Sequence, residues 1–544
     1  MRPLIQEIPT AHTPESLAEQ LRGLPGMVLL RSGTFDSPQA RYSFVTARPF
    51  LTFRSFGSRC EISRTQTPDA RPHLQFGNPW QILDALLARC ELLDEIDLPF
   101  PLGGCFGYWG YDLKNFVEPK LPRRAVNDLE LPDCHAGFYD SLVVFDHHLG
   151  KTFVVSTGLA ADGSRSEKRA GEQMEFWKTQ LQSHAANVGQ TFLSAGSGDF
   201  PVAGWNTGQE GPGNRQAGKP ALHSNLTRAD FIAKVERAQR YIRAGDIYQV
   251  NLSQRLAVEL PWWGEATDEP PAQSSNAPRP AREDARPTKN DFGGWELFQQ
   301  LGAVSPAPFS AFMDCDVGRR HCRFQIASSS PELFLRLSGS HIQTRPIKGT
   351  RPRDPDPTRD AQLAYELQTS TKELAELVMI TDLLRNDLGK VCEYGSVQTP
   401  ELARLERFAQ VQHLVSTVEG RLRAEVTHLA ALASCFPGGS ITGAPKFRAM
   451  EIIDELEPLA RGPYTGALGY LGFNRESQLN IIIRTAICHE RTAYFHVGAG
   501  IVADSNPEAE YEETLAKAAG FLAVLNQPRM DTDGHGWLVM KSSG

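Results

Sequence analysis

The first third of the chain alternates between apolar and polar residues with the period of β-strands. This pattern predicts strands at residues 26–30, 41–45, 50–56, 140–145 and 152–156. Between them, Trp80, Leu83, Leu86 and Leu87 recur at helical spacing and predict a helix over residues 79–93. The glycine-rich and aromatic stretch at residues 101–113 favours packed sheet edges, where backbones approach closely. This region therefore predicts half of a sheet-rich fold.

The second half mixes long helices with strands. A cap signal at Thr227 predicts a helix that ends at Gly245, and imperfect alternation predicts a strand over residues 246–260. Residues 324–337 and 341–350 are expected to pair as one hairpin that turns at 338–340. A helix is predicted from Thr371 to Leu388, with Val378 on its buried stripe and Asp387 off it. The stretch at 478–502 is expected to form two strands, the first of which contains Arg484.

Two polar segments divide this pattern. Residues 187–222 are rich in Gly, Ser, Gln and Asn, and residues 265–291 are rich in Pro and charged side chains. Such compositions cannot offset the entropy of ordering a chain, so we expect a linker and an exposed insertion. The predicted organisation is an N-terminal region over 1–186, a catalytic domain over 223–527 that contains the insertion, and a tail over 528–544.

Composition limits the classes of partner. The formal net charge of −8 and the isoelectric point near 6.0 argue against a nucleic-acid binder, which would favour a basic face. The nine cysteines are scattered and contain no Cys-x-x-Cys pair, so we expect free thiols in a reducing compartment. No apolar run has the length of a signal-peptide core or a membrane span, and we expect a cytoplasmic protein without a membrane partner.

Candidate chemistry begins at Lys348, in the tight turn Pro-Ile-Lys-Gly-Thr. The predicted hairpin brings Glu332 near the same end of the sheet, and the helix that follows carries Glu373 and Glu376 in its first turns. A lysine beside carboxylates could act as a nucleophile, with the carboxylates serving as a general acid or as metal ligands. A surface salt bridge between Glu332 and Lys348 is an equally good interpretation of this pattern alone.

A second group of polar residues lies near the C-terminus. A helix capped by Asn506 places Glu510, Glu513 and Lys517 on one face, where they form either a helix salt bridge or, with Glu376, a site for a hard cation. The loop at Thr442 and Gly443 precedes a helix whose first amides can bind an anion. Arg484 and the glycines Gly498 and Gly500 suggest a carboxylate pocket. Together these features predict a site for a small dianion with Mg²⁺.

These residues lie in long motifs that resemble the chorismate-utilising enzymes, the family of anthranilate, isochorismate and aminodeoxychorismate synthases. The motifs are IYQVNLSQRL, SSSPELFL, PIKGTRPR, ELVMITDLLRNDLGKV, QHLVSTVEG, CFPGGSITGAPKFRAMEIIDELEP, YTGALGYLGFN and ADSNPEAEYEETLAKAAG. They span about residues 225–525, and LLRSG and GCFGYWGYDL extend the resemblance, less tightly, into the first third. The fold that it implies is of the α/β class, α+β type: two packed, mostly antiparallel sheets surrounded by helices.

The resemblance also implies a role for each matching residue. Lys348 would be the nucleophile and Glu332 the general acid, while Glu376, Glu510 and Glu513 would bind Mg²⁺. The residues implied in substrate binding are Gln249, His413, Thr442, Gly443, Tyr464, Arg484, Gly498, Gly500 and Lys517. The family's usual Glu-Asn pair is Glu376-Leu377 here, a departure that affects a neighbouring contact. Ser32 matches a region that forms a regulatory tryptophan pocket in relatives.

The member of the family that this chain resembles depends on Lys348. Lysine there is typical of aminodeoxychorismate synthases, whereas anthranilate and isochorismate synthases have a small residue. Gln249 stands where isochorismate synthases have the lysine that activates water. The expected activity is amination of chorismate for 4-aminobenzoate and folate biosynthesis, with ammonia from a separate glutamine amidotransferase subunit, because we find no cysteine in the setting of the nucleophile elbow of class I glutamine amidotransferases. The alternatives are anthranilate synthase component I and a chorismate-binding subunit without catalysis.

Overall fold

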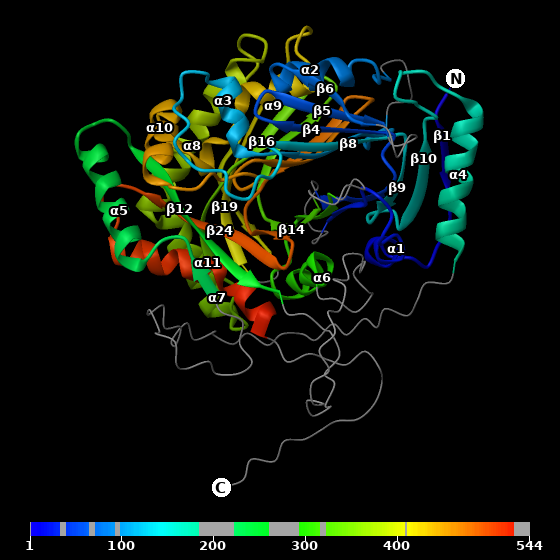
Figure 1. Cartoon of the computed structure of the whole chain (residues 1–544). Coiled ribbons are helices and arrows are strands. Elements are labelled where there is room, and N and C mark those ends of the chain that lie inside the picture. The colour runs from blue at the N-terminus through cyan, green and yellow to red at the C-terminus, as the bar shows by residue number, and fades with distance from the viewer. Residues whose placement is uncertain are drawn as a thin grey trace, which may run out of the picture.

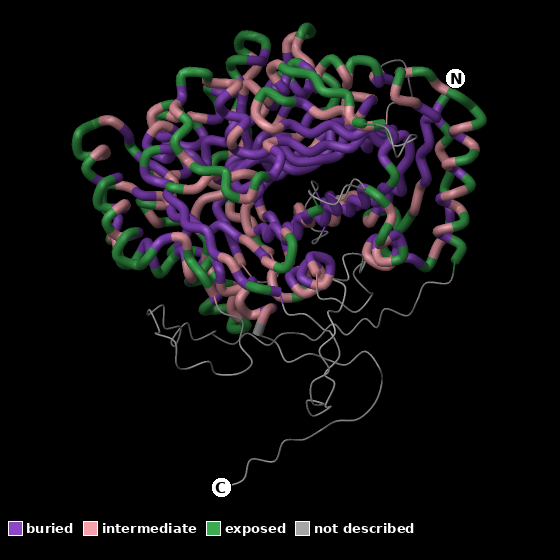
Figure 2. The backbone as a smooth tube through the Cα atoms, viewed as in Figure 1, coloured by how far each residue is buried: buried purple, intermediate pink, exposed green. Residues whose placement is uncertain are grey.

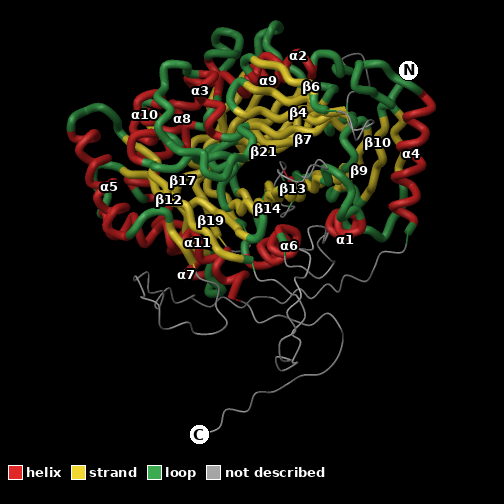
Figure 3. Tube along the Cα trace, viewed as in Figure 1, coloured by secondary structure: helices red, strands yellow, loops and turns green. Residues whose placement is uncertain are grey.

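The computed structural model describes residues 2–32, 40–64, 71–92, 98–183, 222–260, 293–315, 323–408 and 411–526. The proposed linker, except for Leu222, and the whole insertion and tail lie outside these ranges. The described residues form two antiparallel sheets of twelve strands each. Figure 3 shows the sheets at the centre of the molecule, with helices on the outside. The predicted α/β architecture of two packed antiparallel sheets is thereby confirmed.

The first sheet combines strands from both halves of the chain. Its order is β1 (Leu4–Glu7), β10 (Lys151–Ser156), β9 (Ser141–Asp146), β3 (Tyr42–Thr46), β2 (Val28–Arg31), β13 (Phe309–Asp314), β14 (Phe324–Ser330), β23 (Thr485–His489), β24 (Thr492–Ile501), β12 (Gln249–Glu259) and β11 (Leu222–Ser224), with β20 (Gly443–Ala444) beside β12. The N-terminal region joins the catalytic half where β2 pairs with β13, through Leu29↔Phe312 and Leu30↔Ala311.

The second sheet is built in the same way. Its order is β17 (Ile347–Pro352), β19 (Val411–Arg421), β16 (His341–Arg345), β15 (Leu333–Ser338), β22 (Glu476–Ile481), β21 (Ala467–Gly472), β7 (Gly104–Trp109), β8 (Cys134–Tyr139), β4 (Leu51–Phe56), β5 (Arg59–Arg64) and β6 (His73–Phe76), with β18 (Gln398–Arg407) beside β19. Here β7 pairs with β21, from Trp109↔Ala467 to Gly104↔Gly472. Both sheets therefore cross the predicted boundary at residues 187–222, and the two regions are intertwined.

Helices cover the outer faces of both sheets (Figure 1). Their bounds are α1 (Pro14–Gln20), α2 (Pro79–Leu87), α3 (Lys114–Val117), α4 (Glu167–Gln182), α5 (Arg228–Arg243), α6 (Gly294–Val304), α7 (Pro357–Thr369), α8 (Thr371–Gly389), α9 (His428–Cys435), α10 (Lys446–Leu456) and α11 (Pro507–Asn526). Helices α1, α4, α6 and α11 pack on the first sheet, and α7 and α8 pack on the second. The helix predicted over 79–93 ends earlier, at Leu87. Beyond its end, Cys90 and Leu92 are still buried in the core.

The largest apolar cluster lies between the two sheets, where Figure 2 shows a continuous layer of buried strands. Aromatic rings contact one another across it: Phe44 of β3 meets Tyr470 of β21 at 5.1 Å, and Phe324 of β14 meets Tyr108 of β7 at 6.0 Å. A second cluster packs the outer helices on the first sheet and includes the fully buried Trp177 and Trp295. All eight cysteines in the described ranges are buried, free thiols, as expected.

The chain passes between the sheets at several points, and two neighbouring passages carry polar residues of the predicted site. Between β14 and β15 it crosses at Pro331 and Glu332, so the predicted single hairpin over 324–350 is divided between the sheets, and only β15 and β16 pair. Between β22 and β23 it crosses back at Arg484, which lies outside both strands and not within one as predicted. The Ile481 amide donates to the Glu332 carbonyl at 3.1 Å, and the Ser329 amide donates to the Arg484 carbonyl at 3.0 Å.

Candidate active site

Glu332 is a buried carboxyl group at the first of these passages, with 6% of its surface exposed. Burial raises its pKa to about 7, because desolvation disfavours the charged form. A hydrogen bond with Ser440, the nearby Lys348 and a hydrogen bond from the Ile347 backbone act in the opposite direction and limit the rise. The carboxyl therefore keeps its proton until the pH approaches neutrality, as a general acid requires.

Lys348 lies on β17, next to the acid. The pairing Leu333↔Arg345 brings the start of β15 beside the residues that lead into β17, and Lys348 is close enough to Glu332 to influence its pKa, so the predicted proximity of the two residues is present in the structure. A bulge follows the lysine at Gly349, whose φ of +71° favours glycine. A Cβ at Gly349 would also lie 2.7 Å from Leu367 Cδ1. The lysine is half-buried beside this bulge, and its amine approaches Gly500 of the other sheet.

His413 holds this turn from the neighbouring strand β19. Its Nδ1 lies 2.9 Å from the Thr350 hydroxyl, and its ring also hydrogen-bonds with the Gly349 backbone. Burial, assisted by the charge of Arg484, lowers the pKa of His413 to about 4. The imidazole is therefore neutral at physiological pH, and the predicted site residue lies beside the lysine-bearing turn.

The strand pair β12 and β24 forms the opposite wall. Gln249 is buried, and its Nε2 lies 2.4 Å from where a Cβ of Gly500 would be; Lys348 Nζ lies 4.0 Å from the same point. On the neighbouring β20, a Cβ at Gly443 would lie only 2.1 Å from the Gln249 carbonyl oxygen. Glycine at 443 lets its backbone pack closely on the Gln249 backbone, and glycine at 500 leaves room for the side chains of Gln249 and Lys348.

The amides of Gly498 and Gly500 point toward the site. The Asn251 amide donates to the Thr442 carbonyl at 2.8 Å and the Ser253 amide donates to Glu457, so neither bonds to β24. Asn251↔Gly500 and Ser253↔Gly498 are thus non-hydrogen-bonded pairs, in which the glycine N–H and C=O groups face away from β12. Lys517 confirms this direction, because its Nζ donates to the Gly498 carbonyl at 2.8 Å.

Arg484 supplies a cation without a partner. Its backbone has a φ of +49°, and burial lowers the pKa of its guanidinium. Among the residues that the structure describes, no carboxylate forms an ion pair with it. A desolvated guanidinium in this state favours an anionic ligand, and carboxylates match its geometry.

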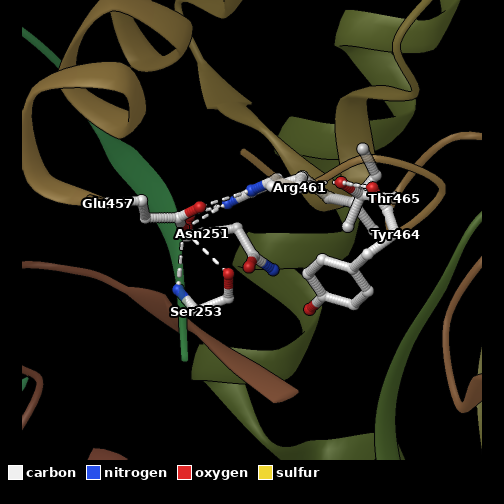
Figure 4. A network of polar contacts seen from close by, with 7 residues as sticks. Asn251, Ser253, Glu457, Arg461, Tyr464 and Thr465 are labelled. Carbon is white, nitrogen blue, oxygen red and sulfur yellow. Dashed lines mark hydrogen bonds and ion pairs between the residues drawn. The ribbon is translucent and has the colours of Figure 1, made fainter. Parts of the chain in front are cut away.

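Tyr464 is positioned by a buried polar network that sequence reasoning missed (Figure 4). Arg461, 2% exposed, forms an ion pair with Glu457 at 2.7 Å and donates to the carbonyls of Asn251 and Ile441 at 2.8 and 3.1 Å. It thereby connects β12, the turn before Thr442 and the segment that carries Tyr464. The Tyr464 ring stacks on His496, with ring centroids 4.8 Å apart. Only the spacing of four residues between Glu457 and Arg461 signals this pair in the sequence.

Thr442 lies where the turn Gly439–Ile441 ends. Its hydroxyl donates to the Gly438 carbonyl at 3.0 Å, which leaves the hydroxyl oxygen able to accept. Behind this turn, Lys446 of α10 forms an ion pair with Asp387 and donates to the Cys435 carbonyl at 2.9 Å. Asp387 is therefore fully buried, and Val378 is 47% exposed, so the predicted burial of these two positions on α8 was wrong. The ion pair fastens α8 to α10.

Glu510 of α11 is close enough to Glu376 of α8 and to Glu513 of its own helix for the carboxylates to influence one another in pairs. Burial raises the pKa of Glu376, to which Glu510 adds repulsion, and burial also raises the pKa of Glu510, to which Glu513 adds repulsion. Glu510 accepts from the Ser505 hydroxyl at 2.6 Å, and Glu513 forms an ion pair with Lys517 at 2.7 Å. Oxygen donors under mutual repulsion fit a hard divalent cation. In the described ranges, however, no three His, Cys, Asp or Glu side chains are grouped at metal-ligand spacing.

Ser32 belongs to a separate cavity between the sheets. Its hydroxyl donates to the Tyr42 carbonyl at 2.8 Å and its amide to Ser43 Oγ at 3.0 Å. Phe309, Tyr470 and Asn480 help to line this cavity, and none of the other predicted site residues does. A regulatory role for Ser32 stays a prediction.

Comparison with known proteins gives a consistent result. The family model described as chorismate binding enzyme matches residues 34–267 and 281–523. The chain is 37% identical to aminodeoxychorismate synthase component 1 of Escherichia coli, over 93% of this chain and 95% of that protein. It is 35% identical to anthranilate synthase component 1 of Acetivibrio thermocellus, over 95% and 93% respectively.

Solved structures agree on the fold. Anthranilate synthase component I from Streptococcus pneumoniae superposes with a TM-score of 0.67 at 27% identity, covering 90% of this chain and 94% of that one. The menaquinone-specific isochorismate synthase MenF of Escherichia coli has a TM-score of 0.63 at 17% identity, over 97% and 94% respectively, which shows the shared fold alone. Within the described ranges, no helix is long and apolar enough to cross a membrane.

Proposed function

Because this chain belongs to the family of chorismate binding enzymes, we propose that it is the synthase component that aminates chorismate to 4-amino-4-deoxychorismate, for 4-aminobenzoate and folate biosynthesis. One observation carries the proposal. The amine of Lys348 is close enough to the buried carboxyl of Glu332 for its charge to influence that group, so a nucleophile and a neutral acid share one site. The 37% identical relative named aminodeoxychorismate synthase component 1 supports this reaction class.

The proposed reaction has two substitutions. Lys348 Nζ attacks C2 of the ring, both ring double bonds shift, and the C4 hydroxyl leaves as water with the proton of Glu332. The carboxylate then takes the proton that the attacking amine releases. Ammonia next forms a bond to C4, both ring double bonds return, and the C2–Nζ bond breaks while the new ammonium group gives a proton to the departing amine. The sum is chorismate plus ammonia giving aminodeoxychorismate plus water.

Charge complementarity orients the substrate. Arg484, Tyr464 and the inward-facing amides of Gly498 and Gly500 suit the enolpyruvyl carboxylate. Thr442, Gly443 and Lys517 suit the ring carboxylate, and His413 lies beside the ring. We propose that Glu376, Glu510 and Glu513 hold Mg²⁺, directly or through water. A bound Mg²⁺ would neutralise the ring carboxylate and the repulsion among the three acids.

We also propose a separate glutamine amidotransferase subunit as the source of ammonia. The one Gly-x-Cys-x-Gly match in the sequence, residues 103–107, runs into strand β7 and buries Cys105 completely, so it is no nucleophile elbow for glutamine hydrolysis. All eight cysteines in the described ranges are buried away from solvent. A partner is therefore needed when glutamine is the nitrogen donor. Free ammonium should replace it in vitro.

The test is to incubate the purified chain with chorismate, Mg²⁺ and ammonium at mildly alkaline pH, and to identify the product by chromatography with mass detection. Aminodeoxychorismate is the expected product. Anthranilate would instead support the second candidate, anthranilate synthase component I, which relatives of nearly equal identity favour. No conversion by a folded protein that binds chorismate would identify a subunit without catalysis.

A further inference from the structure

Two side-chain amides on β12 have oxygens without a partner. Gln249 Oε1 and Asn251 Oδ1 are both buried atoms, and neither has a hydrogen bond among the described residues. Buried polar atoms are nearly always paired, because an unpaired one carries the full cost of desolvation. Because the two oxygens are only two residues apart on one strand, a single bound ligand could satisfy both of them.

Both amides lie on the wall of the active site. Residues 249 and 251 alternate to the same face of β12, opposite the side-chain-free surface of Gly498 and Gly500. Asn251 Oδ1 lies 2.8 Å from where a Cβ of Gly498 would be, and the Tyr464 hydroxyl lies 3.0 Å from that point. Figure 4 shows the Asn251 side chain turned toward the Tyr464 ring and away from the Glu457–Arg461 ion pair.

The missing ligand must donate hydrogen bonds. Carbonyl oxygens only accept, so the carboxylates of a dianionic substrate cannot satisfy them and would be repelled, and its C4 hydroxyl carries a single proton and can satisfy only one of the two oxygens. Lys517 does not donate to either amide oxygen, because it donates to the Gly498 carbonyl and pairs with Glu513. Ammonia, with three N–H groups and no charge, can donate to both oxygens and keep its lone pair for the ring.

We propose that Gln249 and Asn251 form the binding site for the incoming ammonia. This inference rests on the proposed function and adds the location of its second substrate. The two oxygens accept two N–H groups, which aims the nitrogen lone pair at the ring held beside Lys348. When the bond from nitrogen to C4 forms, the new ammonium group gives one proton to the departing Lys348 amine, and no further reactant is needed. Asn251 was not among the residues predicted from the sequence, although its alternation with Gln249 is the signal.

The test varies ammonium and chorismate separately. Asn251→Leu removes the acceptor at nearly constant volume, and Asn251→Asp keeps acceptor oxygens. The matched control is Gln254→Leu, which removes an amide from the opposite face of the same strand, where Ser224 and Thr514 satisfy it. Steady-state amination is measured with ammonium chloride, together with chorismate affinity by calorimetry and the lysine adduct by intact mass without ammonia.

We expect Asn251→Leu to raise the KM for ammonia by about tenfold, the loss of one good hydrogen bond. The chorismate affinity and the yield of lysine adduct should stay within about twofold of wild type, and Asn251→Asp and Gln254→Leu should keep the wild-type KM for ammonia. An unchanged KM for ammonia in Asn251→Leu, or a rise in the chorismate KM instead, overturns the ammonia site but leaves the proposed function intact. A wild-type chain that uses no ammonia overturns both.

Discussion

Replacing Glu332 by glutamine should change stability and catalysis in opposite directions. The carboxyl has an ordinary pKa of 4.5 and a pKa of about 7 in the folded protein, raised chiefly by burial. Each pKa difference of one corresponds to about 1.4 kcal/mol, so burying the ionised form costs roughly 3 kcal/mol above neutral pH. Glutamine has nearly the same shape and does not titrate. The variant should therefore gain stability relative to wild type as the pH rises.

The direction follows from proton linkage. Between pH 4.5 and about 7 the folded protein keeps the Glu332 proton while the unfolded chain has lost it, so the free energy of unfolding of wild type falls with rising pH. The contribution of Glu332 is complete below pH 4.5 and is lost above about 7. Subtracting the variant cancels the titration of other groups, since only residue 332 differs.

The assay is denaturant unfolding of wild type and Glu332→Gln at pH 5, 6, 7 and 8.5. The difference in the free energy of unfolding should move in favour of the variant by up to roughly 3 kcal/mol over this range. Glu236→Gln, on the exposed face of α5, is the control and should show no such trend. A difference that is flat with pH would refute the burial argument. Amination should fall by roughly 10²- to 10⁴-fold in Glu332→Gln, the usual worth of a general acid.

Further variants test the remaining parts of the site. Lys348→Ala should abolish amination at C4 and the covalent adduct in intact mass, and full activity would refute the nucleophile. Arg484→Gln should raise the chorismate KM by roughly tenfold or more, because hydrogen bonds to charged groups are worth about 1.5–3 kcal/mol; an unchanged KM would remove the carboxylate pocket. Chelation of divalent ions should stop turnover, and Glu376→Gln should raise the Mg²⁺ concentration needed for half-maximal rate; equal Mg²⁺ dependence would argue against this ligand.

The local pattern of apolar and polar residues predicted where strands form better than it predicted which strands pair with one another. Alternation predicted the strands that became β2, β3 and β12 within a few residues, and it placed Glu332 near Lys348. It treated residues 324–337 as one strand, although Ser-Ser-Ser-Pro-Glu at 328–332 interrupts the apolar period and the chain changes sheets there. A period reports that a side chain is buried, but not against which sheet. Only the long-range pairing of β14 with β23 and of β15 with β22 separates the two halves.

Charged residues on α8 show a related limit. Asp387 was expected on the exposed side because carboxylates are rarely buried alone. In the structure it is fully buried, since Lys446 and Lys390 both pair with it. Lys446 is nearly 60 residues away in sequence, so helical spacing could not indicate the pair. The unpartnered oxygen of Asn251 was missed for the same reason, as its surroundings come from β24 and Tyr464.

The two neighbouring passages at Glu332 and Arg484, where the chain changes sheets, explain why the site lies where it does. A passage interrupts the ladder, so its residues point neither to a core face nor to solvent, and a polar side chain can be buried there without breaking either sheet. Glu332 and Arg484 occupy these positions, and each is fixed through its own carbonyl, by Ile481 and Ser329 respectively. A positive φ at Arg484 is unfavourable for a residue with a side chain and persists only because the surrounding strands impose it. The proposed acid and the proposed carboxylate-binding cation are thus held by the join between the sheets, while Lys348, the proposed nucleophile, lies on β17 at the sheet edge beside the bulge at Gly349.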